Sequence, residues 1–314
     1  MSDLEQNPES IISEEPPLPE EKVAVLPSVD AEPRLVTPDV TVPVAPPPRD
    51  PAWTGWDVLA IFMVGAVSFV GLLSLLVLLS PGHSIPDKAN HAAARPDIVL
   101  GLQVVVYLIV LACMYIVVMA RTGGAPFLKS VHWNWPTVLW PYVLAGFVLQ
   151  AFAVTMEHFL PLPKETPFDA LLKNPRTVVL IAVFAVTLGP LMEELFFRAF
   201  LYPVLARGFE KLARFAITAL GLAAEHTSLW VRRIGVIAGI AITALGFAGV
   251  HASQYAYSLT LISLLFLVGL VIGWVRAKKN SVAAGLVVHI AYNGVVAFAL
   301  VAARMTGNLD KVSR

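Results

Sequence analysis

The sequence has little cysteine and little charge. Cys113 is the one cysteine among 314 residues, which excludes a disulfide framework within one chain and a cysteine-based metal cluster. Asp, Glu, Lys and Arg make up 14% of the residues, whereas soluble globular domains carry about 25%. Hydrophobic residues make up 57%. This balance predicts a membrane protein.

Common hydrolase patterns are also missing. The sequence contains no HExxH motif for zinc, no Gly-x-Ser-x-Gly nucleophile turn, and no cysteine near a histidine motif. A catalytic centre in this chain is therefore expected to use other residues.

The charges are distributed unevenly along the chain. Residues 1–50 contain eleven Asp and Glu against three Lys and Arg, a net charge of −8, so residues 51–314 carry +8. Residues 1–52 are also rich in proline, which predicts a disordered acidic tail, followed by a transmembrane domain over residues 53–314. The basic excess falls in loops and at span ends, so we interpret it as membrane topology and expect no nucleic-acid partner.

Apolar segments long enough to span a bilayer follow the tail, since about 20 residues cross the hydrocarbon core. The predicted fold is an all-α, polytopic transmembrane helix bundle with seven spans, or eight as the alternative. The spans are Trp56–Ser80, Asp97–Ala120, Thr137–Leu160, Arg176–Arg207, Arg233–Tyr255, Ser258–Val275 and Ser281–Ala303.

The fourth segment is too long for a simple span. Pro190 is expected to kink or restart the helix there, so that Leu191–Gly208 forms a second helical piece. Leu212–Ala224 is apolar but short, which favours an interfacial or re-entrant segment.

Basic residues predict the orientation of the bundle. They gather in the loop after the fourth span and in the loop before the seventh, which share one side in a seven-span arrangement. That side is expected to be cytoplasmic, together with the N-terminus. The lack of eukaryotic targeting signals favours a bacterial plasma membrane.

Tryptophans and glycines near these spans have structural interpretations. Seven tryptophans near the span ends predict an aromatic belt at the membrane surfaces, namely Trp53, Trp56, Trp133, Trp135, Trp140, Trp230 and Trp274. The pairs Gly235/Gly239 and Gly269/Gly273 are each spaced by four residues, which predicts close helix packing.

Charged side chains within an apolar span are costly, which makes them functional candidates. Glu194 and Arg198 are spaced i,i+4 with the acid first, the favoured order for an ion pair on one helix face. Glu193 points about 100° away from Glu194 on a helix, so the two glutamates are expected to have different roles. Glu193 remains available to a cavity as a general base.

Two further polar clusters lie in later spans. His251 ends the segment FAGVH, and His289 shares a helix face with Asn293 in HIAYN. A lone histidine in a membrane is more often a structural hydrogen bonder, and Glu193, Glu194 and Arg198 alone could form a structural ion network. Together the clusters supply the parts of a water-activating hydrolase, or of a metal site with histidine and glutamate ligands.

The segments EELFFR, FAGVH and HIAYN, in this order, resemble the motifs EExxxR, FxxxH and HxxxN/D of a known family. This is the CAAX protease and bacteriocin-processing family of intramembrane proteases, also called CPBP or Abi, which includes the Ras-converting prenyl endopeptidase. The motif-bearing region runs from about residue 178 to 303. The resemblance does not cover the tail or the first three spans.

The resemblance implies a catalytic set of Glu193, Glu194, Arg198, His251, His289 and Asn293. Glu193 would activate water beside His251, while His289 and Asn293 would stabilise the oxyanion. Glu194 and Arg198 would support the site. Members are commonly classed as metalloproteases, so the resemblance also implies a divalent metal such as zinc, with Glu193, His251 and His289 as ligands.

The expected partners are membrane lipid and a membrane-associated or lipidated peptide substrate. Two other functions remain as alternatives. One is a catalytically idle scaffold or immunity-type protein on the same fold. The other is a proton-coupled transporter. The absence of a clear inverted repeat in the sequence argues against a transporter.

Overall fold

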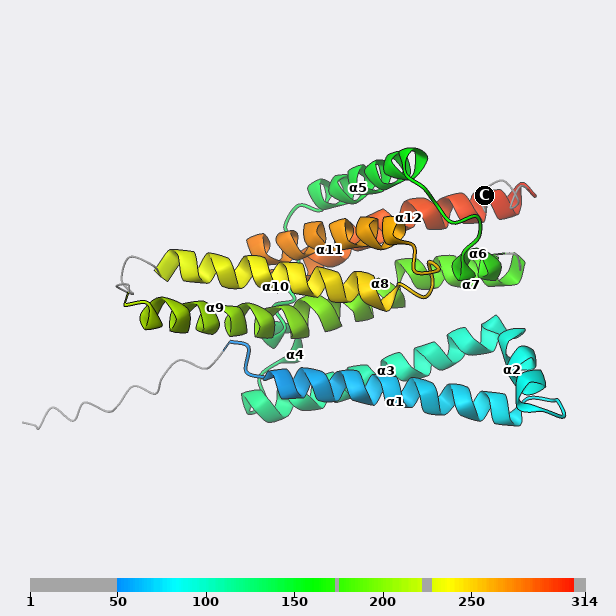
Figure 1. Ribbon diagram of the computed structural model, residues 1–314, viewed down its shortest axis with the longest axis horizontal. Helices are drawn as coiled ribbons and strands as arrows, with labels where there is room; N and C mark the ends of the chain where they lie inside the picture. Colours follow the sequence, from blue (N-terminus) through cyan, green and yellow to red (C-terminus); the bar gives the residue numbers. More distant parts are fainter. Residues whose placement is uncertain (1–49, 173–174, 222–227, 308–314) are drawn as a thin grey trace, which may run out of the picture. The chain divides into compact units, whose positions relative to one another are not determined.

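The computed structural model describes residues 50–172, 175–221 and 228–307, and within these ranges it contains helices and no strand (Figure 1). This confirms the predicted all-α fold. Residues 1–49 of the predicted tail lie outside the described residues. In chain order the described elements are α1 (Gly55–Leu79), α2 (Ile85–Ala93), α3 (Pro96–Thr122), α4 (Phe127–Ser130), α5 (Trp140–Phe159), α6 (Pro167–Leu172), α7 (Pro175–Val186), α8 (Leu188–Glu193), the π-helix η1 (Glu194–Leu201), α9 (Tyr202–Ala219), α10 (Ser228–Val250), α11 (Leu259–Lys279) and α12 (Val282–Met305).

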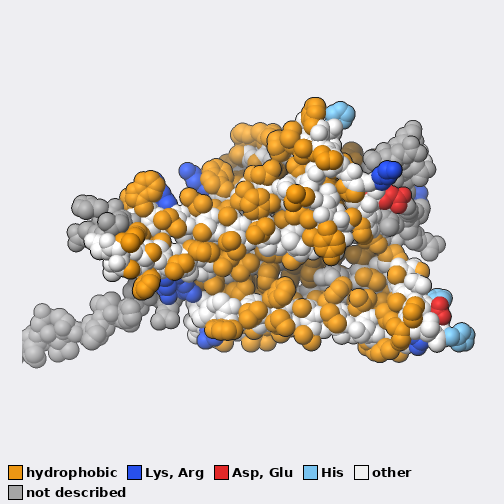
Figure 2. Space-filling view, viewed as in Figure 1, with side chains coloured by type: hydrophobic (Ala, Val, Ile, Leu, Met, Phe, Trp, Pro, Cys, Tyr) orange, Lys and Arg blue, Asp and Glu red, His pale blue; other side chains and the backbone are white. Residues whose placement is uncertain are grey.

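Six helices of the described chain are long and apolar enough to cross a membrane: α1, α3, α5, α10, α11 and α12. A seventh candidate is the bent pair of α7 and the helical stretch Leu188–Ala219. These seven coincide with the predicted spans, and no eighth is found among the described residues. Figure 2 shows hydrophobic side chains over most of the visible face of these helices.

The bend in the fourth span falls at Thr187, so the prediction of a break at Pro190 was wrong. α7 ends at Val186 and α8 begins at Leu188, with a 40° angle between the two pieces. Thr187 has φ −127° and ψ −97°, outside the helical region. Pro190 is the third residue of α8, where an amide hydrogen has no intrahelical acceptor, so proline is tolerated.

The interfacial or re-entrant segment predicted at Leu212–Ala224 stays a prediction, and most of its described part belongs to α9. α9 continues unbroken from Tyr202 to Ala219 and includes the first eight residues of that segment. Residues 222–224 lie outside the described residues.

Close approaches at glycines hold the central helices together, as their spacing predicted. A Cβ added at Gly235 or Gly239 of α10 would lie 2.5 Å and 3.0 Å from backbone atoms of Ala206 in α9. A Cβ at Gly269 of α11 would lie 3.0 Å from Ala244 of α10. These contacts fix α9, the helix that follows η1, against α10, and they fix α10 against α11.

α1 and α3 form an antiparallel pair joined by α2 (Figure 1). A capping box of Thr54 and Asp57 starts α1, and the Asp57 carboxylate also accepts a hydrogen bond from Arg121 of α3 at 2.7 Å. Five of the belt tryptophans are strongly exposed, namely Trp56, Trp135, Trp140, Trp230 and Trp274. Trp53 departs from the predicted belt because only 1% of it is exposed.

Candidate active site

The two adjacent glutamates lie at the junction of two kinds of helix. Glu193 is the last residue of α8, and Glu194 is the first residue of the π-helix η1. The Glu194 side chain is 0% exposed, whereas that of Glu193 is 20% exposed. The expected separation of the two carboxylates is confirmed. π-Helices are rare and occur frequently at functional sites, which singles out this junction.

Glu194 belongs to a buried ionic network. Its Oε1 atom lies 3.2 Å from Nη1 of Arg198, which is the predicted i,i+4 ion pair, and 3.0 Å from Nδ1 of His289 on α12. The Arg198 guanidinium also donates to the carbonyl of Gly269 and lies over the Phe247 ring, 4.7 Å from its centroid. Each charge in this network thus has an opposite or polar partner, as burial requires.

Glu193 faces both histidines. Its Oε1 lies 3.6 Å from Nε2 of His251, and its Oε2 lies 3.5 Å from Nε2 of His289. These separations exceed those of good direct hydrogen bonds. The three side chains come from α8, from the turn after α10, and from α12, so the fold brings together residues that lie 58 and 96 positions from Glu193 in the sequence.

Both histidines are oriented through their Nδ1 atoms. His251 Nδ1 donates to the carbonyl of Phe247 at 2.7 Å, and His289 Nδ1 donates to the Glu194 carboxylate at 3.0 Å. Because a carbonyl or an ionised carboxylate only accepts, Nδ1 carries the hydrogen in each ring. In a neutral imidazole this leaves the lone pair on Nε2, the atom that faces Glu193.

Asn293 lies one turn beyond His289 on α12. Its Nδ2 donates to the carbonyl of Ala185 at 2.8 Å, in the last turn of α7 just before the bend. One of its two amide hydrogens is engaged there. Asn293 thus fixes α12 against the broken span.

A cavity of about 370 Å³ contains the exposed faces of Glu193 and His251. Apolar side chains of α1 and α3 form much of its wall, including Phe62, Phe69 and Val106. Polar side chains that the motifs did not indicate also reach it, namely Gln103, Tyr107 and Gln254. Their one sequence signal was polarity within or beside an apolar span, as for Gln103 in α3.

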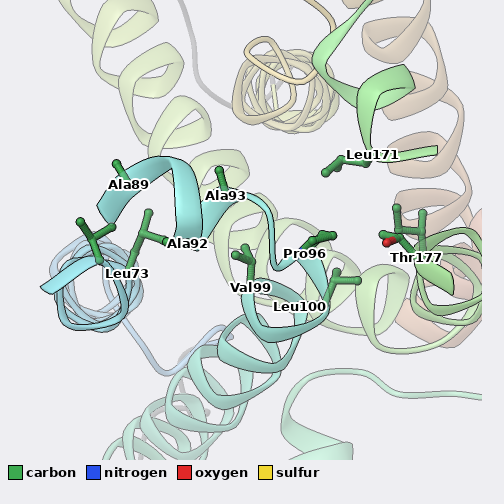
Figure 3. A pocket seen from close by; sticks show the side chains of 11 residues that line it. Leu73, Ala89, Ala92, Ala93, Pro96, Val99, Leu100, Leu171 and Thr177 are labelled. Atoms are coloured by element: carbon green, nitrogen blue, oxygen red, sulfur yellow. The ribbon is translucent and has the colours of Figure 1, made fainter. Parts of the chain in front are cut away.

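A second cavity, of about 410 Å³, lies between the α1–α3 pair and α6–α7 (Figure 3). Figure 3 shows aliphatic side chains such as Leu73, Leu100 and Leu171 around it. Thr177 is its one polar side chain, and no titratable group lines it. The cavity that holds Glu193 is therefore the candidate site for chemistry.

The three predicted metal ligands have suitable chemistry. Two histidine Nε2 atoms and a glutamate form a donor set used by zinc enzymes, and both Nδ1 atoms have the outer partners usual for metal-bound histidines. Within the described residues, however, no group of three or more His, Cys, Asp or Glu side chains is arranged to hold a metal ion.

Residues 175–295 match the family described as type II CAAX prenyl endopeptidase Rce1-like. The match begins with α7 and ends in α12, and it includes every predicted site residue. This match supports membership of the CAAX/CPBP family for the matched part of the chain. No curated protein and no solved structure matches the chain at a significant level.

The match to this family fits the physical setting of the site. The family domain comprises the bent span and α9 to α12, which are the helices that contribute Glu193, His251 and His289. Apolar helices of spanning length identify an integral membrane protein, and the family match supports a CAAX-type intramembrane endopeptidase. The α1–α3 pair and α5 lie outside the matched residues.

Proposed function

We propose that this protein hydrolyses a peptide bond of a membrane-associated or lipidated peptide, with a water molecule activated by Glu193. One observation carries the proposal. Within a cavity, Glu193 stands between the Nε2 atoms of His251 and His289, each fixed in orientation by an acceptor at its Nδ1.

The attacking water would lie beside Glu193 and His251. The Glu193 carboxylate and the His251 Nε2 lone pair are both acceptors, so one water can donate a hydrogen to each. A lone pair of the water oxygen then points away from both groups, toward a substrate carbonyl in the cavity. As the oxygen attacks the carbonyl carbon, Glu193 takes a proton from the water.

The tetrahedral intermediate would carry its negative charge on the former carbonyl oxygen. His289 and Asn293 are the proposed donors to this oxyanion. Because His289 Nδ1 donates to Glu194, its Nε2 donates only when the ring is an imidazolium. The Glu194 carboxylate, which accepts the Nδ1 hydrogen, orients the His289 ring, as the aspartate of a Ser-His-Asp triad orients its histidine.

Collapse of the intermediate completes the reaction. The carbon–nitrogen bond breaks, and the leaving amine takes the proton that Glu193 accepted from the water. The products are a carboxylic acid and an amine, between which a proton transfers to leave a carboxylate and an ammonium group, and Glu193 returns to its ionised state. Arg198 touches no reacting atom in this scheme and acts as a positioning residue for Glu194.

A lipidated peptide is the proposed substrate class. The family is described as prenyl endopeptidases, and the cavity wall opposite Glu193 is formed by apolar side chains of α1 and α3. Such a wall suits a hydrocarbon chain attached to the peptide, while Gln103 and Gln254 offer hydrogen bonds to its backbone.

A divalent metal bound by Glu193, His251 and His289 stays a prediction. When bound, it would polarise the attacking water and the scissile carbonyl. The steps above need only the chain's own groups. Elemental analysis of the purified protein tests the prediction, because a stoichiometric metal that is absent from His251→Ala would support a metal site independently of activity.

We also propose that the N-terminus lies in the cytoplasm and that the membrane is a bacterial plasma membrane. Basic residues gather at the α9–α10 end and the α11–α12 end, which lie on the side from which α1 begins. Replacing Cys113 gives a cysteine-free chain. Single cysteines introduced at Lys278 or Lys88 should then react with impermeant reagents from opposite sides of sealed vesicles.

The activity is tested with purified protein in lipid nanodiscs and a set of farnesylated and unmodified peptides. Glu193→Gln and His251→Ala should each lower the cleavage rate by about 10²–10⁴-fold, the usual contribution of a general base. Glu157→Gln is a matched control, because Glu157 also lies in a span, on α5, and does not line the cavity. Cleavage that persists unchanged in both site variants would refute the mechanism.

The same preparation separates the alternatives. A folded wild-type protein that cleaves none of the peptides, but binds a partner through residues 1–52, would favour the idle scaffold. Proton-coupled flux in reconstituted vesicles without cleavage would favour the transporter.

A further inference from the structure

The segment just before α1 lies against the π-helix that follows Glu193. Trp53 is 1% exposed and stacks on Phe200 of η1, with ring centroids 4.6 Å apart and an interplanar angle of 24°. Its indole Nε1–H donates to the Phe200 carbonyl at 3.1 Å. A residue expected to anchor the chain at the membrane surface is instead part of the packing around the candidate site.

The π-helix has a missing donor in its own backbone. In a π-helix the amide of residue i+5 donates to the carbonyl of residue i, and Tyr202 donates to Phe197 in this way. The next such bond would join residue 203 to Arg198, but residue 203 is proline and has no amide hydrogen. A buried carbonyl without a partner is costly, so the Arg198 carbonyl needs a donor from elsewhere.

Arg276 of α11 supplies that donor. Its Nε donates to the Arg198 carbonyl at 3.2 Å, and the side chain is buried, with 3% of the residue exposed. The same guanidinium donates from Nη1 to Asn280 at 2.8 Å and lies 5.7 Å from the centroid of the Tyr202 ring. None of the proposed catalytic steps uses Arg276, so its burial needs another explanation.

A relay of hydrogen bonds connects this arginine to the segment before α1. Asn280 donates to Nδ1 of His132, and Nε2 of His132 donates to the Asp50 carboxylate at 3.0 Å. Arg207 of α9 donates to the carbonyls of Pro51 and Trp53. The segment Asp50–Trp53 is thereby fixed from α9 and, through the relay, from α11.

We propose that Trp53 and Arg276 are positioning residues of the peptidase site, which hold η1 as a π-helix by donating to its Phe200 and Arg198 carbonyls. The inference rests on the proposed function only in taking the site to be a peptidase site, because the hydrogen bonds to η1 do not depend on that function. A π-helix holds one residue more than an α-helix over the same turn, and each residue of an α-helix turns the chain by about 100°. Reversion of η1 to α-helical bonding would therefore rotate Glu193 relative to α9 and away from the two histidines.

The proposal enlarges the functional unit beyond the family domain. Residues 175–295 contain Arg276 but not Trp53. A chain that begins after Trp53 would lack one of the two donors, whereas a chain that begins at residue 48 would keep both.

The test uses conservative changes in the full chain. Trp53→Phe keeps a ring to stack on Phe200 but removes the N–H donor. Arg276→Lys keeps the charge but loses the planar fork that reaches the Arg198 carbonyl and Asn280 together. Trp56→Phe and Arg233→Met are matched controls, because both residues are exposed and the Arg233 guanidinium lies over Trp230, outside η1.

Two measurements are made on each variant. Hydrogen exchange followed by mass spectrometry should show faster exchange over residues 194–205 in Trp53→Phe and Arg276→Lys, with α5 and α12 unchanged. The kcat for peptide cleavage should fall by about 10- to 100-fold with little change in KM, the effect of a misplacement of about 1 Å. Both controls should behave as wild type.

Each other outcome has a definite meaning. Wild-type exchange over residues 194–205 in both variants would overturn the proposal, even if activity fell. Faster exchange with an unchanged kcat would overturn the positioning role. If the wild-type protein cleaves no peptide but exchange quickens as expected, the hold on the π-helix is supported and the proposed function fails.

Discussion

The helices α1 and α3 differ from α10, α11 and α12 in what surrounds them, although all five are apolar enough to span a membrane. In the most apolar stretch of α1 only 6% of residues are buried, and in that of α3 17%, against 39% in each of the other three. α1 and α3 have the higher mean hydropathy, 2.6 against 1.9 to 2.2. Among these five helices the more apolar pair is the less buried, and His251 and His289 lie next to or in the less apolar helices α10 and α12, which pack against protein.

The difference extends to the ionic groups of the two regions. The pair Arg198–Glu194 is buried beside α10 to α12, while Arg121–Asp57 joins α1 to α3 with Arg121 about half exposed. Arg198→Met should lower the free energy of unfolding by about 3–5 kcal/mol, because it leaves the Glu194 carboxylate buried without its arginine.

Arg121→Met is the matched change in the other region, and it should shift the unfolding transition much less, since Arg121 is about half exposed and Asp57 keeps its hydrogen bonds from Thr54. Thermal unfolding in the same detergent measures both. Equal shifts for the two variants would mean that the burial of Glu194 does not decide the energetics of its pair.

Replacing a glycine in each region tests the same comparison, with smaller expected changes in stability. A Cβ added at Gly285 of α12 would lie 2.9 Å from Oε2 of Glu194 and 3.2 Å from Ile272. Gly285→Ala should therefore destabilise the protein by about 1–3 kcal/mol, the usual cost of overpacking, and lower cleavage by displacing Glu194.

Gly71 of α1 has no neighbouring atom within 4 Å of an added Cβ. Gly71→Ala should instead stabilise the protein, by about 0.5–1 kcal/mol, because alanine favours the helix. A loss of stability in Gly71→Ala would indicate that α1 packs more tightly than its exposure shows. Chemical unfolding curves measure both variants.

The smallest effect is expected at Asp50, where the chain enters α1. A hydrogen bond from His132 holds the pKa of the Asp50 carboxyl below its usual range. The folded-state pKa is depressed, so this stabilisation is present above the unfolded pKa of about 4 and is lost as pH falls through the folded value.

Asp50→Asn should therefore lower stability near pH 7 by less than about 1 kcal/mol, because the carboxylate is largely exposed. The difference from wild type should shrink as the pH falls below about 4 and vanish below the folded-state pKa. A difference that grew as pH fell would contradict the assignment. Unfolding measured from pH 3 to 7 gives the comparison.

The sequence predicted most of the spans because hydropathy and length are sufficient for that purpose. Helical phase alone also separated Glu193 from Glu194 and paired Glu194 with Arg198. The convergence of Glu193 with His251 and His289 required a match to a family, since three helices far apart in the sequence contribute to it.

Other features depended on tertiary context. Pro190 suggested a helix break at that residue, but proline is tolerated in the first turn of α8. The break lies at Thr187 instead. The burial of Trp53 has no local pattern that indicates it, and the π-helix has a single one. Pro203 is the one local signal, and its effect is visible only once Arg276 is seen to donate to Arg198.

The central claim is that adjacent glutamates divide the work, with Glu193 reacting and Glu194 holding the site together. Its most direct test compares Glu193→Gln with Glu194→Gln, measuring the cleavage rate and the unfolding temperature of both. The account predicts that Glu193→Gln abolishes cleavage while the unfolding temperature stays near that of wild type, and that Glu194→Gln lowers the unfolding temperature markedly. Cleavage retained by Glu193→Gln, or an unfolding temperature unaffected by Glu194→Gln, would contradict it.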